Sequence, residues 1–146
     1  MTGHPLVAVS GLTKRFPVRK GLFSRETGQV HAVEDVSFAI GNNEVLGLAG
    51  ESGSGKSTIG RMLLHLIAPT SGQILFDGES VNGMSEARLQ RFRRRAQIVF
   101  QDPFGSLDPL MNVGEAIGEP LVIQGMARGA ELADRVAGLL DAVSLP

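Results

Sequence analysis

The start of the chain carries the apolar–polar alternation of β-strands. Leu6 to Phe16 alternates loosely and predicts a first strand, and Val30 to Ile40 predicts a second, half-buried strand. Residues 17–28 between them are rich in Lys, Arg, Gly and Ser, which predicts a long exposed loop. Further along, Gln73 to Phe76 predicts another strand, closed by a turn at Asp77-Gly78.

Two short apolar runs lack this alternation. The first covers residues 45–49 (Val-Leu-Gly-Leu-Ala), and the second is Ile98-Val99-Phe100. Continuous apolar runs of this length suit strands that are buried on both faces, as in a parallel sheet covered by helices. We therefore expect both runs to be interior strands.

Helical periodicity appears in four places. Ile59, Met62, Leu63 and Leu66 stand at i, i+3, i+4 and i+7, so they predict a helix with one apolar face on the sheet. Pro69 should stop that helix. Ser85 to Arg95 predicts a second helix with Ser85 as its N-cap. The chain becomes helical again after Met111, where Pro120 is expected to kink or end the helix. The apolar positions of this helix are Val113, Ile117 and Leu121. A final amphipathic helix is predicted by the apolar positions Leu132, Val136, Leu139, Leu140 and Val143.

Between the first apolar run and the first helix lies the motif G-x-x-x-x-G-K-[ST]. Its residues are Gly50, Glu51, Ser52, Gly53, Ser54, Gly55, Lys56, Ser57 and Thr58. Polyphosphate oxygens need many hydrogen-bond donors at short range, and glycines let backbone N–H groups turn toward the anion. The start of a helix adds free N–H groups and a positive dipole end. Lys56 should reach the β- and γ-phosphates, Ser57 should coordinate Mg²⁺, and Thr58 should donate to the α-phosphate. The motif predicts binding of a nucleoside triphosphate, ATP with Mg²⁺.

Composition narrows the remaining classes. A length of 146 residues suits about one domain, and the net charge of −1 gives no general attraction to nucleic acid or anionic membrane. The absence of cysteine excludes disulfides and thiolate metal sites. No signal peptide is visible, and the longest apolar-leaning stretch, Ile59 to Ala68, is far shorter than the ~20 residues of a membrane span. Any membrane association is therefore expected to go through a partner.

At this point the sequence resembles the ATP-binding cassette subunits, and most closely those of oligopeptide and dipeptide importers. Besides residues 50–58, the resemblance rests on segments in that family's order and spacing. These segments are residues 14–16, 32–40, 69–72 and 97–103. The resemblance to oligopeptide and dipeptide importers rests on residues 17–23, 104–109 and 114–121. It implies an α/β fold: a P-loop NTPase core with an N-terminal antiparallel β subdomain (about 1–102 together) and the start of a helical subdomain (about 103–146).

The resemblance also assigns roles. Phe16 would stack on the adenine ring, and Gln101 would touch Mg²⁺ or the attacking water and relay the state of the γ-phosphate. Phe104 and Leu107 would be contacts for a transmembrane permease subunit. A second ATP-binding subunit, identical or not, would complete the ATP sites. The family implies import of peptides or similar small solutes, from a peripheral position on the cytoplasmic face of the inner or plasma membrane.

Several of the family's catalytic segments are not found in the sequence. It contains no Leu-Ser-Gly-Gly-Gln segment, no Walker B strand with an Asp-Glu pair and no switch histidine. Asp77 follows an apolar strand but precedes Gly78 in a turn, so we reject it as a Walker B carboxylate. His4, His31 and His65 come too early for a switch histidine. We therefore expect an N-terminal portion of a longer subunit that binds ATP without hydrolysing it alone.

Alternatives remain open on sequence alone. The chain could be a non-catalytic nucleotide-binding fragment, or a cassette ATPase that acts on DNA or ribosomes; a metabolic P-loop kinase or GTPase is disfavoured. A basic cluster, Arg91, Arg93, Arg94 and Arg95 around Phe92, admits a nucleic-acid or lipid-headgroup role. Without companion aromatic residues or net positive charge, a solvated helix end is the favoured interpretation, and no nucleic-acid partner is expected.

Overall fold

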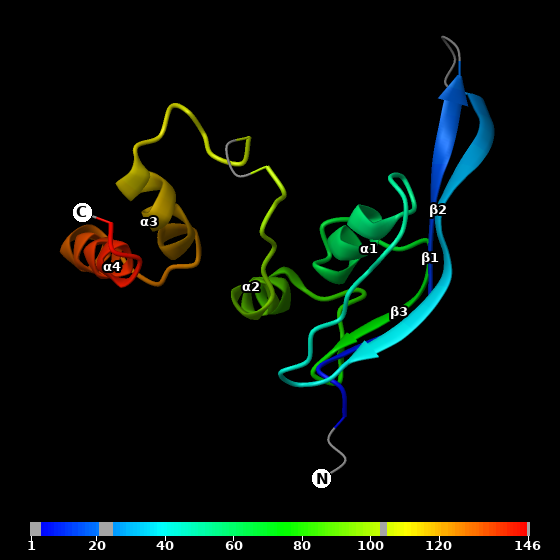
Figure 1. The fold of residues 1–146 in the computed structure, drawn as a ribbon, viewed down its shortest axis with the longest axis horizontal. Helices are drawn as coiled ribbons and strands as arrows, with labels where there is room; N and C mark the ends of the chain where they lie inside the picture. Colours follow the sequence, from blue (N-terminus) through cyan, green and yellow to red (C-terminus); the bar gives the residue numbers. More distant parts are fainter. Residues whose placement is uncertain (1–3, 21–24, 103–104, 146) are drawn as a thin grey trace. The chain divides into compact units, whose positions relative to one another are not determined.

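A computed structural model describes residues 4–20, 25–102 and 105–145 (Figure 1). The chain divides into two compact units, Met1–Gln97 and Ile98–Pro146. From sequence, the boundary was expected near residue 102. Each unit is described by itself below.

The first unit is built on an antiparallel sheet of four strands in the order β2-β1-β3-β4. The strands are β1 (Val7–Lys20), β2 (Arg25–Ile40), β3 (Ser71–Phe76) and β4 (Glu79–Ser80). Its helices are α1 (Lys56–Leu63) and α2 (Glu86–Arg95). The strands predicted from Leu6, Val30 and Gln73 are therefore confirmed, and the antiparallel subdomain with them. Both predicted helices form, but α1 ends at Leu63, so Leu66 lies outside it and Pro69 is not what stops it.

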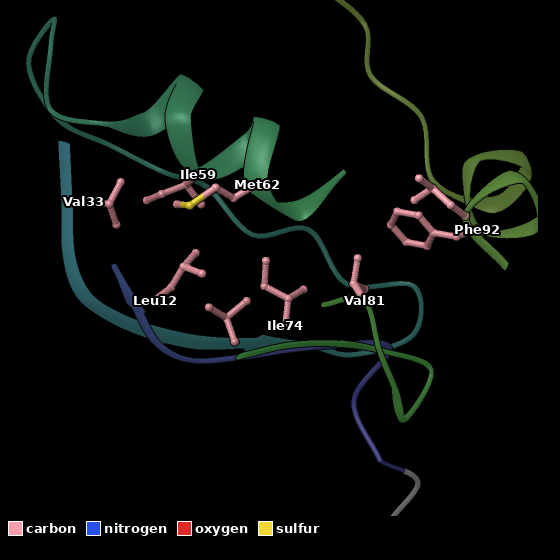
Figure 2. Close-up of a cluster of buried hydrophobic side chains, with 9 residues drawn as sticks. Leu12, Val33, Ile59, Met62, Ile74, Val81 and Phe92 are labelled. Atoms are coloured by element: carbon pink, nitrogen blue, oxygen red, sulfur yellow. The ribbon is translucent and has the colours of Figure 1, made fainter. Parts of the chain in front are cut away.

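The core of this unit lies between α1 and the sheet (Figure 2). Ile59 and Met62 are the buried residues of α1. They stand three positions apart in the helix, so both side chains lie on the same face. They pack in one cluster with Leu12, Val33 and Ile74 of the sheet. Leu12 and Met62 are fully buried. This packing fixes the position of the helix and of the loop that leads into it.

The predicted loop over residues 17–28 is wrong for most of its length. β1 and β2 pair through Pro17↔Gln29, Val18↔Gly28 and Lys20↔Arg25, so the two strands continue as a long ribbon. Over the described residues, β3 pairs with β1 no further than Thr13, so beyond that point β1 and β2 pair only with each other. Two strands without a covered face need no apolar alternation, and this is why the polar composition was misread. Residues 21–24 lie outside the described part.

The two interior strands predicted at 45–49 and 98–100 do not form. No residue of either run belongs to a strand, and Val45 and Val99 are each 96% exposed. An interior strand needs neighbouring strands for its N–H and C=O groups and a layer over each face. Over the described residues, these runs have neither strand partners nor covering layers. Their apolar composition therefore predicted burial that the structure does not show.

The second unit contains the helices α3 (Val113–Ile123) and α4 (Gly129–Ala142). α3 begins with a capping box: Asn112 Oδ1 accepts from the N–H of Glu115 at 2.8 Å, and Glu115 Oε2 accepts from the N–H of Asn112 at 3.1 Å. Gly118 faces α4, and a Cβ there would make ordinary van der Waals contacts, at 3.4 Å, with Leu132 and Val136. Pro120 does not end α3, because the bond from Gln124 N–H to Pro120 C=O continues it.

Candidate functional site

The glycine-rich motif forms a tight loop that enters α1. Gly55 is the N-cap of α1 in a left-handed conformation with φ 90°. A Cβ at this position would stand 2.2 Å from the carbonyl oxygen of Ala32 in β2. Only glycine combines this dihedral angle with so close an approach. The loop is thereby fixed against β2 where the helix begins.

The Lys56 side chain lies inside the loop. Its Nζ donates to the carbonyl oxygens of Gly50 and Glu51, both at 2.6 Å, and to Ser54 Oγ at 3.2 Å. The ammonium is therefore held inside the loop by backbone and side-chain oxygens of residues 50–54. A cation in this position suits an anion that brings several oxygens to the same loop.

The first turn of α1 presents donors next to this ammonium. The N–H groups of Lys56, Ser57 and Thr58 have no partner within the helix, because the first turn of any helix lacks them. No acidic residue stands in this turn and no side chain caps it. Ser57 is exposed and Thr58 is half-buried. Free N–H groups, the positive dipole end and the ammonium together make a site for phosphate oxygens.

This arrangement also fits Mg²⁺ in the way expected of the motif. Ser57 supplies one hydroxyl oxygen beside the phosphate site, and a magnesium ion completes its shell with phosphate oxygens and water rather than with an all-protein cage. Over the described residues, no cluster of three or more Asp, Glu, His or Cys side chains could hold a metal by itself. The protein alone therefore offers a partial ligand set.

Phe16 lies on the same strand pair that contacts the loop. It pairs with Val30, two residues from the Ala32 carbonyl that meets Gly55, and a strand rises about 3.3 Å per residue. Its ring is 39% exposed, and Lys14 Nζ lies 5.0 Å from the ring centroid. Lys14 is held there by donating to the Ala68 carbonyl oxygen at 2.7 Å. An accessible aromatic face thus lies near the phosphate loop.

Beside Phe16, a charged cluster joins the two strands. Arg15 pairs with Glu34, and His31 Nδ1 lies 3.0 Å from the other carboxylate oxygen. The hydrogen bond from Arg15 lowers the pKa of Glu34, with the Coulomb attraction of Arg15 and His31 adding to it, and Glu34 raises the pKa of Arg15. The cluster is exposed, so salt screens it.

The lowered pKa of Glu34 predicts a pH-dependent contribution to stability. Its folded pKa lies below the unfolded value of about 4.3, so the contribution is full above that value and is lost as pH falls through the folded pKa. We expect Glu34→Gln to lower the urea midpoint slightly at pH 7, and the difference from the original chain to be smaller at pH 3. A difference of equal size at both pH values would contradict this origin.

The other predicted residues have the following surroundings, each within its own unit. Gln101 is an exposed residue of the second unit. Phe104 lies outside the described residues, and Leu107 is 61% exposed. Asp77 lies in the turn after β3 and pairs with Arg95 at 2.9 Å. His31 takes part in the cluster with Glu34. Within the described ranges, no helix is both long and apolar enough to cross a membrane.

Most of the chain matches a known protein family. Residues 33–146 match the family described as ABC transporter. The chain is 51% identical over 143 residues to the glutathione import ATP-binding protein GsiA of Salmonella paratyphi A and 49% identical to that of Escherichia coli K12. Each match covers 98% of this chain, and the chain spans 23% of the length of these curated relatives.

Solved structures agree with the fold. The dimeric post-hydrolysis structure of the ATP-binding cassette MJ0796 bound to ADP and Pi matches with a TM-score of 0.71 at 28% identity. That match covers 96% of this chain and 58% of the other. The structure of cbiO1 from Clostridium perfringens, part of the ABC transporter complex cbiONQ, matches with a TM-score of 0.68 at 26% identity. That match covers 97% of this chain and 51% of the other. The α/β cassette fold expected from sequence is therefore confirmed, over part of the cassette.

Proposed function

Because the chain belongs to the ABC transporter family, we propose that it binds ATP with Mg²⁺ in the loop from Gly50 to Thr58 and serves as part of an ATPase subunit that drives solute import. The observation that carries this proposal is the Lys56 ammonium held within 2.6 Å of two loop carbonyls at the start of α1. Phosphate oxygens entering the loop would meet this cation and the free N–H groups together.

Each site residue takes one role in the proposal. Lys56 binds the β- and γ-phosphates, Ser57 coordinates Mg²⁺, and Thr58 donates to the α-phosphate. Phe16 stacks on the adenine, a contact worth roughly 1–3 kcal/mol by analogy with base–aromatic stacking. Gln101 contacts Mg²⁺ or the attacking water and reports the state of the γ-phosphate. When bound, Mg²⁺ would neutralise charge that develops on the phosphate oxygens.

The proposed solute is a peptide or a similarly small molecule. Support comes from the relatives at 49–51% identity, whose names specify glutathione import, and glutathione is itself a small peptide. The sequences of residues 17–23 and 104–109, which resemble segments typical of oligopeptide importers, support the same proposal. We place the protein at the cytoplasmic face of the membrane, attached through its partners.

Two partners are proposed. One is a second ATP-binding subunit, since MJ0796 is described as dimeric. The other is a permease subunit, whose contact surface we place on the second unit. There, an apolar hollow of about 740 Å³ lies between α3 and α4 and includes Val122, Ile123 and Leu132. Val122 and Ile123 are exposed, as a surface for a partner requires.

We propose that the 146-residue chain alone binds nucleotide without turnover. It contains no Leu-Ser-Gly-Gly-Gln segment and no apolar strand ending in Asp-Glu. Hydrolysis in P-loop ATPases needs a carboxylate on Mg²⁺ and a general base that polarises the attacking water. Without these groups, ATP would be held and released intact.

The experiment is a titration of a fluorescent ATP analogue with Mg²⁺, comparing the chain with its Lys56→Ala variant. Loss of the charge-assisted contacts should weaken binding roughly 10- to 100-fold. The matched control is Arg61→Ala, which removes the same charge from an exposed position of the same helix and should leave affinity unchanged. Equal affinity in Lys56→Ala would show that nucleotide binds elsewhere or not at all.

A further inference from the structure

A hollow in the first unit is unrelated to the phosphate loop. It lies between α2 and the β3–β4 hairpin and encloses about 350 Å³, the lower end of the range for small-ligand pockets. Phe76, Met84 and Phe92 supply its apolar lining. The two rings meet edge to face with centroids 5.1 Å apart, and Phe92 is buried, so this lining is fixed in place.

One wall of the hollow is a row of guanidinium groups. Arg88, Arg91 and Arg95 all line it and stand at i, i+3 and i+7 on α2, which places them on one helical face. Arg95 is positioned by two contacts: an ion pair with Asp77 at 2.9 Å and a stacking contact 4.9 Å from the Phe76 ring centroid. A guanidinium held in this way keeps its remaining donors aimed in a fixed direction.

The other two arginines are different. Among the residues that the structure describes, the side chains of Arg88 and Arg91 make no hydrogen bond or ion pair, while the Arg93 side chain on the same helix pairs with Glu86 at 3.7 Å. Like charges one turn apart repel each other and destabilise a helix slightly. On the opposite wall, Asp77 is occupied by Arg95, and Glu79 is the remaining carboxylate. The five charged groups sum to +1, with the positive charge gathered on the helix wall.

We propose that this hollow binds the phosphate group of a small organic phosphate, with Arg88 and Arg91 gripping the oxygens and the apolar part of the ligand resting on Phe76 and Met84. The planar fork of arginine matches phosphate oxygens in pairs, and a doubly charged phosphate neutralises two adjacent guanidinium groups. Glu79 repels an anion from the hairpin wall, which directs the phosphate to the helix wall. The phosphate at the head of a membrane lipid offers the same chemistry.

The test uses the full chain in a Lys56→Ala background, so that the phosphate loop does not contribute. Glycerol 3-phosphate is titrated by calorimetry, with the Arg88→Gln/Arg91→Gln variant compared with Arg93→Gln/Arg94→Gln. Both variants lose two positive charges from α2, but only the first loses them from the hollow. We expect at least ~10-fold weaker binding in the first variant and less than ~2-fold change in the second. Helix content by circular dichroism confirms that each variant is folded.

Further measurements identify the source of the phosphate and keep the test decisive. Flotation with phosphatidic acid vesicles, against phosphatidylcholine vesicles, assigns a lipid headgroup if binding needs Arg88 and Arg91 while glycerol 3-phosphate does not bind. Arg91→Lys keeps the positive charge but loses the planar fork of donors, so it should weaken binding. This single variant provides the test if the double variant fails to fold. The proposal is overturned if no phosphate probe binds, if both double variants bind equally, or if succinate binds as tightly as glycerol 3-phosphate.

Discussion

Replacing Gly55 with alanine is expected to destabilise the first unit and to remove nucleotide binding. The new Cβ would lie 2.2 Å from the Ala32 carbonyl oxygen and 3.2 Å from Val33 Cγ2. Because backbone atoms of β2 cannot move aside cheaply, the loop or the start of α1 must shift. Overpacking of this kind costs about 1–3 kcal/mol, and the left-handed φ of 90° adds roughly 1–2 kcal/mol for any residue with a Cβ.

Gly53→Ala is the matched control for this prediction. Gly53 also has a positive φ, of 85°, but a Cβ there would meet no atom within 4 Å. It should therefore show the dihedral penalty alone, with a smaller loss of stability. Urea unfolding followed by circular dichroism measures both variants, and the fluorescent nucleotide titration measures binding. If the two variants lose equal stability, the contact between the loop and Ala32 does not carry the effect.

The second large effect is expected in the core. Leu12 of β1 is fully buried in the cluster between the sheet and α1, so Leu12→Ala should leave a cavity and cost about 2–5 kcal/mol of unfolding free energy. The position of α1 depends on this packing, so nucleotide affinity should fall as well. Because the chain has neither tryptophan nor tyrosine, circular dichroism at 222 nm is the suitable signal for the unfolding curve.

Leu66→Ala provides the comparison for Leu12→Ala. It makes the same chemical change at a position that is 48% exposed, just after α1. The expected loss there is within about 0.5 kcal/mol, as for most surface substitutions. A similar loss at both positions would mean that Leu12 is not part of a close-packed core.

Patterns that depend on near neighbours predicted structure well in this chain. The apolar spacing of Ile59 and Met62 identified α1 and its buried face, and the Asp77-Gly78 turn correctly closed β3. The loop motif was recognisable because phosphate binding restricts residue types at fixed spacing. Its predicted roles, like those of Phe16 and Gln101, remain proposals for the experiments above.

Patterns that depend on distant parts of the chain predicted less. The apolar runs at 45–49 and 98–100 show only that these segments favour burial. The composition of a run does not determine which strands would pair with it. The ribbon at 17–28 failed in the opposite sense, because cross-strand pairing there proceeds without an apolar face. The hollow beside α2 was missed too, since Phe76 and Asp77 join Arg95 only through the fold.

The Lys56 contacts also change how nucleotide binding should be viewed thermodynamically. The Lys56 ammonium already donates hydrogen bonds to Gly50, Glu51 and Ser54. A bound phosphate would therefore replace existing hydrogen bonds of the ammonium rather than add the first ones. The measured enthalpy is then the difference between two sets of charge-assisted hydrogen bonds. In return, the loop is already folded around a positive charge before ATP arrives, so less conformational entropy is lost on association. An affinity that is modest in enthalpy and favourable in entropy is the expected signature of a loop that carries its own internal cation.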